Sequence, residues 1–219
     1  MKALKKATLV GLMAMAIGGS AMAAPAQVGY LQVMGFENPK AEAQVNQQLA
    51  HIAKDFKGQV AALKPVKNFE GLGVMKMDTT FENKDVLNVG VETYVIKAGA
   101  AHGETKFMTI LFDKKTGKTL NPAEVLQYAK VDRKALVKVV TMRAEQAVKQ
   151  GAHINVKALE KKIIDQKYVP SIFFRADGVP MIYFQQGEVA PISDGMIVIP
   201  LPELLQMVQK EKAPVKAAK

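Results

Sequence analysis

The sequence of 219 residues contains no cysteine and no tryptophan, and it has only three histidines. Without cysteine the chain cannot form a disulfide, a thiol nucleophile, a thiolate metal site or a lipoprotein anchor. No uncharged apolar segment reaches the roughly 20 residues that cross a bilayer. Apolar residues still make up 49% and charged residues 23% of the chain. This balance is typical of a folded globular protein with a substantial core.

Residues 1–23 contain the three parts of a secretory signal in the usual order. Three lysines precede an apolar run at residues 7–17, and Ala21, Met22 and Ala23 have the pattern that a signal peptidase accepts. The alternative, an N-terminal membrane anchor, requires a longer apolar run. We therefore expect export, cleavage after Ala23, and a soluble mature protein in the periplasm or outside the cell. Cleavage removes three lysines, which lowers the formal net charge from +10 to +7.

Hydrophobic periodicity predicts the elements of the first half of the chain. A short strand is expected at residues 28–34. Apolar side chains then recur every three or four residues over residues 40–56, the spacing of one helix face. Alternating residues further along predict an antiparallel sheet with one buried face and with Asn88 on the other. The strands of this sheet are expected at residues 72–81, 86–96 and 106–112.

Capping residues mark the helices of the second half. Asn121, Pro122 and Glu124 together form a capping box, and Asp132 and Asn155 are suited to begin two further helices. Because strands and helices occur in blocks without regular alternation, the predicted fold class is α+β. The remaining expected elements are strands at residues 171–175, 179–185 and 196–199 and a short helix at 202–207.

We expect four segments along the chain. The signal peptide comprises residues 1–23, and a small N-terminal α/β lobe comprises residues 24–68. A larger domain of antiparallel sheets packed with helices comprises residues 69–209, and a basic tail comprises residues 210–219. The gap near Phe69 separates the two lobes.

Residues that carry catalysis in other proteins are few and scattered here. Ser171 and Ser193 lie outside the motifs of known serine nucleophiles, and the three histidines have no metal-ligand spacing. Glu188 and Asp194 lie on one loop and have the residue types of an acid/base pair, although a solvated turn is the favoured interpretation. We expect no enzyme activity, no metal and no cofactor. An enzyme acting on envelope polymers, with a site assembled from distant residues, is one alternative, and a structural or chaperone-like envelope protein is another.

The lysines are dispersed over helix faces and the tail, without the interleaved aromatic residues of a nucleic-acid surface. We therefore expect no nucleic-acid partner. In an exported protein, a net charge of +7 favours attraction to anionic envelope polymers or lipid headgroups. Scattered lysine is also the ordinary way in which a helix surface is made soluble.

Two stretches of the sequence have a pattern that is more specific than their composition alone. The first is Gly-Ala-Ala-His-Gly-Glu-Thr at residues 99–105, followed by Phe-Asp-Lys-Lys-Thr-Gly-Lys at residues 112–118. The second is Tyr-Phe-Gln-Gln-Gly-Glu-Val-Ala-Pro at residues 183–191, leading to a final strand. In order and spacing, residues 74–205 resemble the RsiV-like family of domains of unknown function. Residues 28–63 resemble the small PdaC-type domain that usually precedes it.

The resemblance implies an extracytoplasmic, non-enzymatic α+β module. In the anti-sigma factor RsiV this module senses lysozyme, and in PdaC it accompanies a separate peptidoglycan deacetylase domain; this chain is expected to be the module alone. Ala100 and Gly187 depart from the family pattern, which has glycine and tyrosine at these positions, and residues 192–194 replace a more aromatic stretch. Lysozyme is basic and is repelled by a receptor of net charge +7, so lysozyme binding is the minority interpretation.

The leading hypothesis is an envelope-associated binding domain whose partner is an envelope protein or a cell-wall polymer. Recognition is expected on the connection at residues 99–105 and the loop at residues 185–195, because binding groups tend to lie on loops of a rigid scaffold. His102 either presents its imidazole to a ligand or holds the hairpin by bonding a backbone carbonyl. The candidate binding residues are Gly99, Ala101, His102, Gly103, Tyr183, Glu188 and Pro191.

Overall fold

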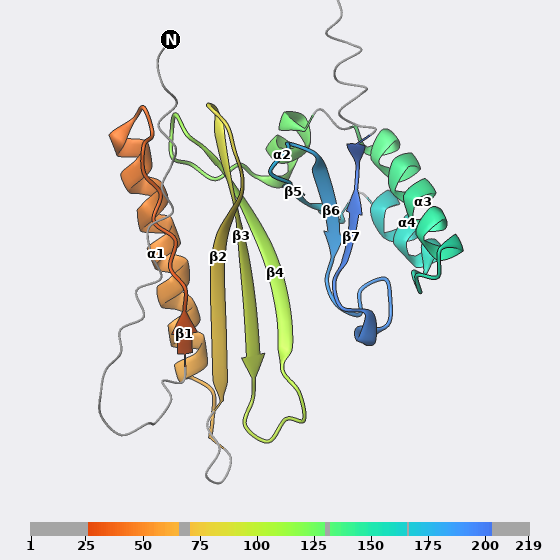
Figure 1. The fold of residues 1–219 in the computed structure, drawn as a ribbon, viewed down its shortest axis with the longest axis horizontal. Coiled ribbons are helices and arrows are strands. Elements are labelled where there is room, and N and C mark those ends of the chain that lie inside the picture. The colour runs from red at the N-terminus through yellow and green to blue at the C-terminus, as the bar shows by residue number, and fades with distance from the viewer. Residues whose placement is uncertain (1–25, 66–70, 130–131, 166, 203–219) are drawn as a thin grey trace, which may run out of the picture. The chain divides into compact units, whose positions relative to one another are not determined.

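The computed structural model describes residues 26–65, 71–129, 132–165 and 167–202. It contains one four-stranded sheet, in the order β1-β2-β3-β4, and one three-stranded sheet, in the order β5-β6-β7 (Figure 1). Four helices accompany the sheets in this part of the chain, which confirms the predicted α+β class. The expected signal at 1–23, the tail at 210–219 and all but the first residue of the helix expected at 202–207 lie outside the described residues.

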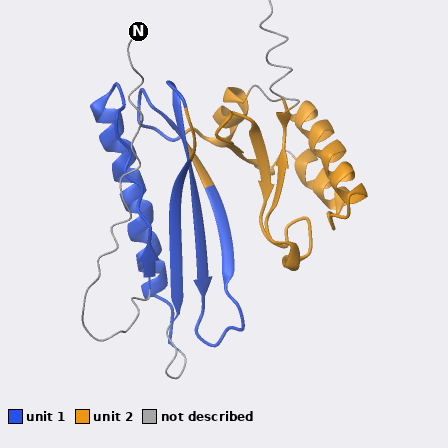
Figure 2. Ribbon diagram, viewed as in Figure 1, with its two compact units in different colours: residues 1–79, 83–108, 112–119 blue, residues 80–82, 109–111, 120–219 orange. Residues whose placement is uncertain are grey.

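The chain divides into two compact units (Figure 2). Unit 1 comprises residues 1–79, 83–108 and 112–119, and unit 2 comprises residues 80–82, 109–111 and 120–219. The division between these units does not coincide with the boundary expected between residues 68 and 69. The physical reason is that the N-terminal helix packs on the strands that follow it.

Unit 1 places the long helix α1 (Pro39–Ala61) against the sheet of β1 (Ala26–Val28), β2 (Leu72–Glu82), β3 (Val86–Ile96) and β4 (Glu104–Asp113). The packing is close, since a Cβ atom on Gly73 would lie 2.2 Å from a methyl group of Val60. Val60 is buried, and this contact explains why the helix continues beyond the predicted end at residue 56. The buried residues of α1 are Ala41, Val45, Leu49, Ala53, Phe56 and Val60.

The strand predicted at residues 28–34 is wrong over most of its length. β1 ends at Val28 and pairs with β2 in parallel. Beyond it, the side chain of Asn46 on α1 accepts a hydrogen bond from Val33 N and donates one to Val33 O, both at 2.9 Å. A helix side chain thus takes the place of a neighbouring strand as the partner of this backbone.

The prediction of one buried and one exposed face is also wrong for the first half of β3. Residues 86–91 are all buried, and Asn88, expected on the exposed face, is 1% exposed. Alternation of residue type therefore underestimated the burial of this strand, in which Asn88 and Gly90 are buried together with the apolar residues between and around them.

The turn after β4, residues 113–118, docks onto the start of α1. The amide of Asn38, the N-cap residue of that helix, donates to Lys115 O at 2.7 Å, and the amide of Gln48 donates to Gly117 O at 2.8 Å. Gly117 has φ of 72° and packs so closely that a Cβ atom would lie 2.6 Å from Ala41 O. This family-like motif is therefore part of the packing within unit 1.

Unit 2 contains α2 (Pro122–Tyr128), α3 (Arg133–Lys149), α4 (Val156–Ile164), β5 (Ser171–Phe174), β6 (Pro180–Phe184) and β7 (Ile197–Pro200). The capping box at Asn121 is confirmed, because its side chain accepts from Glu124 N while the Glu124 carboxylate accepts from Asn121 N. Asp132 and Asn155 cap α3 and α4 as predicted. In the described part of the chain, no helix has both the length and the apolar character needed to cross a membrane.

Candidate functional site

The first predicted recognition segment is the connection between β3 and β4, here called the hairpin tip (residues 97–103). Ala100 N donates to Lys97 O at 3.0 Å, and Gly99 has φ of 78°, which closes the turn. Gly103 N donates to the hydroxyl of Tyr94 at 3.2 Å, and a Cβ atom on Gly103 would lie 2.4 Å from the tyrosine ring. Gly99 and Gly103 are thus required by the backbone path and by packing.

Ala101 and His102 are exposed on the hairpin tip. Within the described residues, no hydrogen bond or ion pair involves the imidazole of His102. The expected bond from this ring to a backbone carbonyl is therefore not formed. His102 is accessible to a partner, but its neighbours do not hold it in one orientation.

The second predicted segment is here called the clamped loop (residues 185–195), between β6 and β7 (Figure 1). The carboxylate of Glu188 folds back to accept a hydrogen bond from Gln185 N at 2.5 Å, and Glu188 N donates to Gln185 O at 3.0 Å. The same carboxylate lies 2.8 Å from Nζ of Lys162 on α4. The two side chains are 19% and 33% exposed, which makes this a partly buried ion pair.

Tyr168 completes the contacts of Glu188. Its hydroxyl donates to the Glu188 carboxylate at 3.4 Å, and Nζ of Lys162 lies 5.1 Å from the centre of its ring. Burial, reinforced by the negative charge of Glu188, raises the pKa of Tyr168 well above its usual value. The phenol therefore remains a hydrogen-bond donor, and Glu188 fixes the loop with charge-assisted contacts.

The rest of the clamped loop is held by its own amides and by α4. Gln186 Nε2 donates to Ile192 O at 2.8 Å, and Val189 O accepts from Asn155 N at 2.8 Å. Gly187 has φ of 78°, a conformation that the tyrosine of the family pattern would rarely adopt. Outside these bonds the loop presents Pro191 and Ile192 to solvent, and Ile192 is 62% exposed.

The structure brings together three polar residues that sequence spacing did not connect. Asp194 accepts from Ser193 Oγ at 3.0 Å and lies 3.1 Å from Nδ1 of His153. A catalytic triad has histidine between serine and carboxylate, whereas here the carboxylate lies between the other two. In this arrangement the imidazole is not placed to accept the proton of Ser193. Among the described residues, no three acidic or histidine side chains gather as metal ligands.

Tyr183 lies in the interior of unit 2 and is only 4% exposed. Its ring centre is 5.9 Å from that of Phe173, and it lines a pocket of about 140 Å³ together with Ser171 and Val169. The predicted binding residues therefore do not converge in one unit. Gly99, Ala101, His102 and Gly103 belong to unit 1, and Tyr183, Glu188 and Pro191 belong to unit 2.

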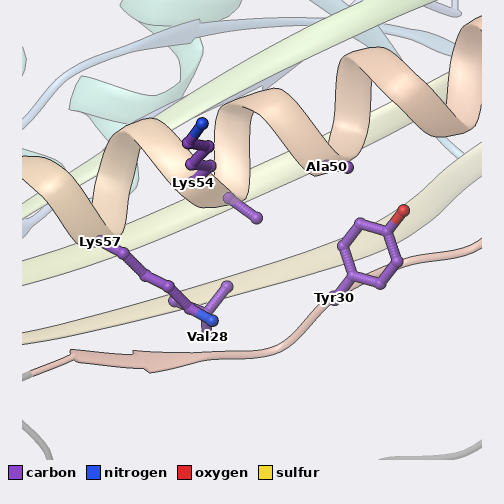
Figure 3. Close-up of a pocket in the computed structure, with 6 residues that line it drawn as sticks. Val28, Tyr30, Ala50, Lys54 and Lys57 are labelled. Carbon is purple, nitrogen blue, oxygen red and sulfur yellow. The ribbon is translucent and has the colours of Figure 1, made fainter.

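Sequence reasoning missed a pocket of about 290 Å³ in unit 1, between the segment after β1 and α1 (Figure 3). The only sequence feature that could have indicated this pocket is a pair of lysines one helical turn apart on α1, Lys54 and Lys57. The ring of Tyr30 reaches the same place from a segment that periodicity assigned to a strand. The residues that line this pocket are Val28, Tyr30, Ala50, Ala53, Lys54 and Lys57.

Comparison with known proteins gives a result at the level of the fold. No protein-family profile matches the chain, and no curated protein matches it. A crystal structure of a DUF3298 family protein from Bacteroides fragilis is similar over 83% of each chain, at 12% identity and a TM-score of 0.56. This similarity shows the fold.

A DUF3298 family protein from Pseudomonas aeruginosa matches over the same share of each chain, at 12% identity and a TM-score of 0.49. The assignments to the RsiV-like family and to a PdaC-type N-terminal domain were made from motifs, and they remain predictions.

Proposed function

We propose that this protein is an exported, non-enzymatic binding module of the cell envelope, of the RsiV-like type, and that the clamped loop of unit 2 binds a protein partner. The observation that carries the proposal is a loop that is rigidly bonded yet exposes a large aliphatic side chain at its tip. Ile192 is 62% exposed, while Glu188 and Gln186 hold the backbone around it.

A pre-ordered loop loses little conformational entropy on binding, which favours recognition. An exposed aliphatic residue beside Pro191 provides apolar area that a partner can bury, and Met196, just after the loop in the sequence, is 38% exposed. Apolar anchors surrounded by polar groups are typical of protein interfaces. The surface at 191–196 therefore suits a protein better than a hydrophilic polymer.

The arrangement of Ser193, Asp194 and His153 supports the non-enzymatic part of the proposal, because it lacks the order that activates a serine. Incubation of the protein with peptidoglycan, with and without divalent metal, is expected to release neither fragments nor acetate. Reproducible turnover that is lost in His153→Ala would contradict this part.

The binding experiment is capture of proteins from an envelope extract by the purified protein and two variants. Ile192→Ser is expected to weaken capture at least tenfold, because a buried aliphatic anchor contributes about 1.5–3 kcal/mol. Ile164→Ser is the matched control, since Ile164 is 54% exposed on α4 in the same unit. Equal capture by wild type and Ile192→Ser would overturn the proposed surface. Purified lysozyme is included as one probe, and its binding in an Ile192-dependent manner would identify it as a partner.

The predicted export and signal cleavage are tested separately from binding. Intact-mass measurement of the protein recovered outside the cytoplasm is expected to give a chain that begins at Ala24, because residues 21–23 match the peptidase pattern. A soluble exported species that retains residues 1–23 would contradict the signal assignment.

A further inference from the structure

The pocket between the segment after β1 and α1 in unit 1 has the chemistry of a small-ligand site (Figure 3). Its volume of about 290 Å³ lies just below the range of about 300–1,000 Å³ that is typical of ligand pockets. Its floor is apolar, formed by Val28, Ala50 and Ala53. The small side chain of Ala50 leaves space in front of the tyrosine ring.

Tyr30 is held in position in this pocket although it is 46% exposed. Its hydroxyl donates to the backbone carbonyl of Asn46 on α1 at 3.2 Å. The side chain of Asn46 also binds both backbone groups of Val33, which fixes the segment that carries the tyrosine. The ring thus offers a flat, pre-ordered face to solvent. Such a face packs well against the C–H face of a sugar ring, because tyrosine has an apolar body with a polar edge.

Lys57 extends from α1 toward Val28, whereas Lys54 leaves the helix in another direction, away from Lys57 and Tyr30 (Figure 3). Both lysines are exposed, and neither has an ion-pair partner in the described part of the chain. The nearest acid along α1, Asp55, is paired with His51 at 3.3 Å. The unpaired ammonium group of Lys57 beside apolar side chains attracts an anion, and Lys54 adds positive charge to the same part of α1.

We propose that this pocket binds an acidic sugar unit, with the sugar ring against Tyr30 and its anionic group paired with Lys57. The anionic group is a carboxylate or a phosphate, since either one pairs with an ammonium group. The proposal does not rest on the proposed function, because it concerns a different unit and different residues.

Four probes distinguish the parts of the proposal. N-acetylmuramic acid and N-acetylglucosamine 1-phosphate carry the two anionic groups, N-acetylglucosamine is the neutral sugar, and inorganic phosphate is the anion without a sugar. Ligand-detected NMR and calorimetry of the full protein are expected to show binding of one or both acidic sugars. The neutral sugar and free phosphate are each expected to bind at least tenfold more weakly. Equal affinity for the neutral sugar, or for free phosphate, would overturn the proposal.

Variants test the location of the site. Lys54→Glu with Lys57→Glu is expected to weaken binding of the acidic sugar at least tenfold. Lys40→Glu with Lys64→Glu is the matched control, because both lysines are exposed in unit 1 outside the pocket and the change in net charge is the same. It is expected to alter affinity less than twofold.

Ala50→Phe is expected to abolish binding by filling the space in front of Tyr30 while leaving both lysines in place. Ala50 is exposed on α1, so the fold tolerates the change, and circular dichroism checks it. Equal losses in the two double variants, full binding by Ala50→Phe, or no binding of either acidic sugar at millimolar concentration would overturn the proposed site.

Discussion

The hairpin tip and the clamped loop have similar compositions, with glycines at positive φ, small residues and one ionisable side chain expected to recognise a ligand. Their bonding differs. In the clamped loop the ionisable residue, Glu188, contacts Lys162, Tyr168 and the backbone of Gln185. In the hairpin tip the ionisable residue, His102, has no such contact within the described residues.

The difference teaches that a polar residue on a family-like loop can serve recognition indirectly. Glu188 does not point outward to a ligand, but it fixes the backbone that presents Ile192. His102 points outward, but ordering it on binding costs side-chain entropy. For this reason our proposal places binding on the clamped loop and not on the hairpin tip.

The largest effect on stability is expected when the contacts of the Glu188 carboxylate are removed. Glu188→Ala leaves the ammonium of Lys162 and the amide of Gln185 without their acceptor, so unit 2 is expected to lose about 2–3 kcal/mol of unfolding free energy. Chemical denaturation followed by circular dichroism measures the loss. Glu145→Ala, at an exposed position on α3, is the control and is expected to change stability by less than about 0.5 kcal/mol. If both variants behave alike, the carboxylate does not hold the loop.

A smaller effect is expected at the hairpin tip. Gly103→Ala places a methyl group against the ring of Tyr94, which costs about 1–2 kcal/mol through overpacking. The same substitution in a Tyr94→Ala background is expected to cost much less, because the clashing ring is gone. A double-mutant cycle measures this coupling. An unchanged cost in that background would show that the glycine is required for another reason.

The turn between β5 and β6 provides an acid that is held only at the surface, as a contrast to Glu188. Hydrogen bonds from Arg175, and then from the backbone of Val179, lower the pKa of Asp177 to about 2. Because the folded-state pKa is depressed, this contribution to stability is present above the unfolded value of 3.8 and is lost as the pH falls towards 2.

Asp177→Asn is therefore expected to lower the melting temperature slightly and by a constant amount above about pH 4. The difference from wild type is expected to shrink as the pH falls towards 2. Thermal scans of both proteins from pH 7 to pH 2 measure it. A difference that grows on acidification would reverse the assigned sign.

The smallest effect is expected for His102→Ala. The side chain is exposed and has no partner in the described part of the chain, so stability is expected to change by less than about 0.5 kcal/mol. Capture of envelope proteins is expected to stay at the wild-type level. Loss of capture with unchanged stability would assign recognition to the hairpin tip and would reverse the comparison between the two loops.

Local signals predicted much of the fold. The capping box at Asn121 and the caps at Asp132 and Asn155 depend on residues within four positions of one another, and all three begin helices as expected. The parallel pairing of β1 with β2 was not predicted, and neither was the bonding of Val33 by Asn46. These features depend on contacts between distant residues, which periodicity does not report.

The candidate sites show the same limit. Glu188 and Pro191 were selected on a resemblance, but the partners that define the role of Glu188 come from α4 and from the segment that follows it. The approach of His153 to Asp194 joins residues 41 positions apart. The pocket at Tyr30 combines a helix face with a segment that lacks regular structure, so neither alternation nor helical spacing marks it.

The docking of the turn at 113–118 onto α1 has a consequence for the order of folding. Its side-chain bonds join residues that are 77 and 69 positions apart, from Asn38 to Lys115 and from Gln48 to Gly117. Contacts at such separations raise the contact order of unit 1, which favours slower folding than local contacts do. While the chain is being synthesised, α1 has no complete partner surface until residues near 118 have emerged. The N-terminal helix is therefore among the first segments to be made, but its packing surface is complete only when the middle of the chain has been made.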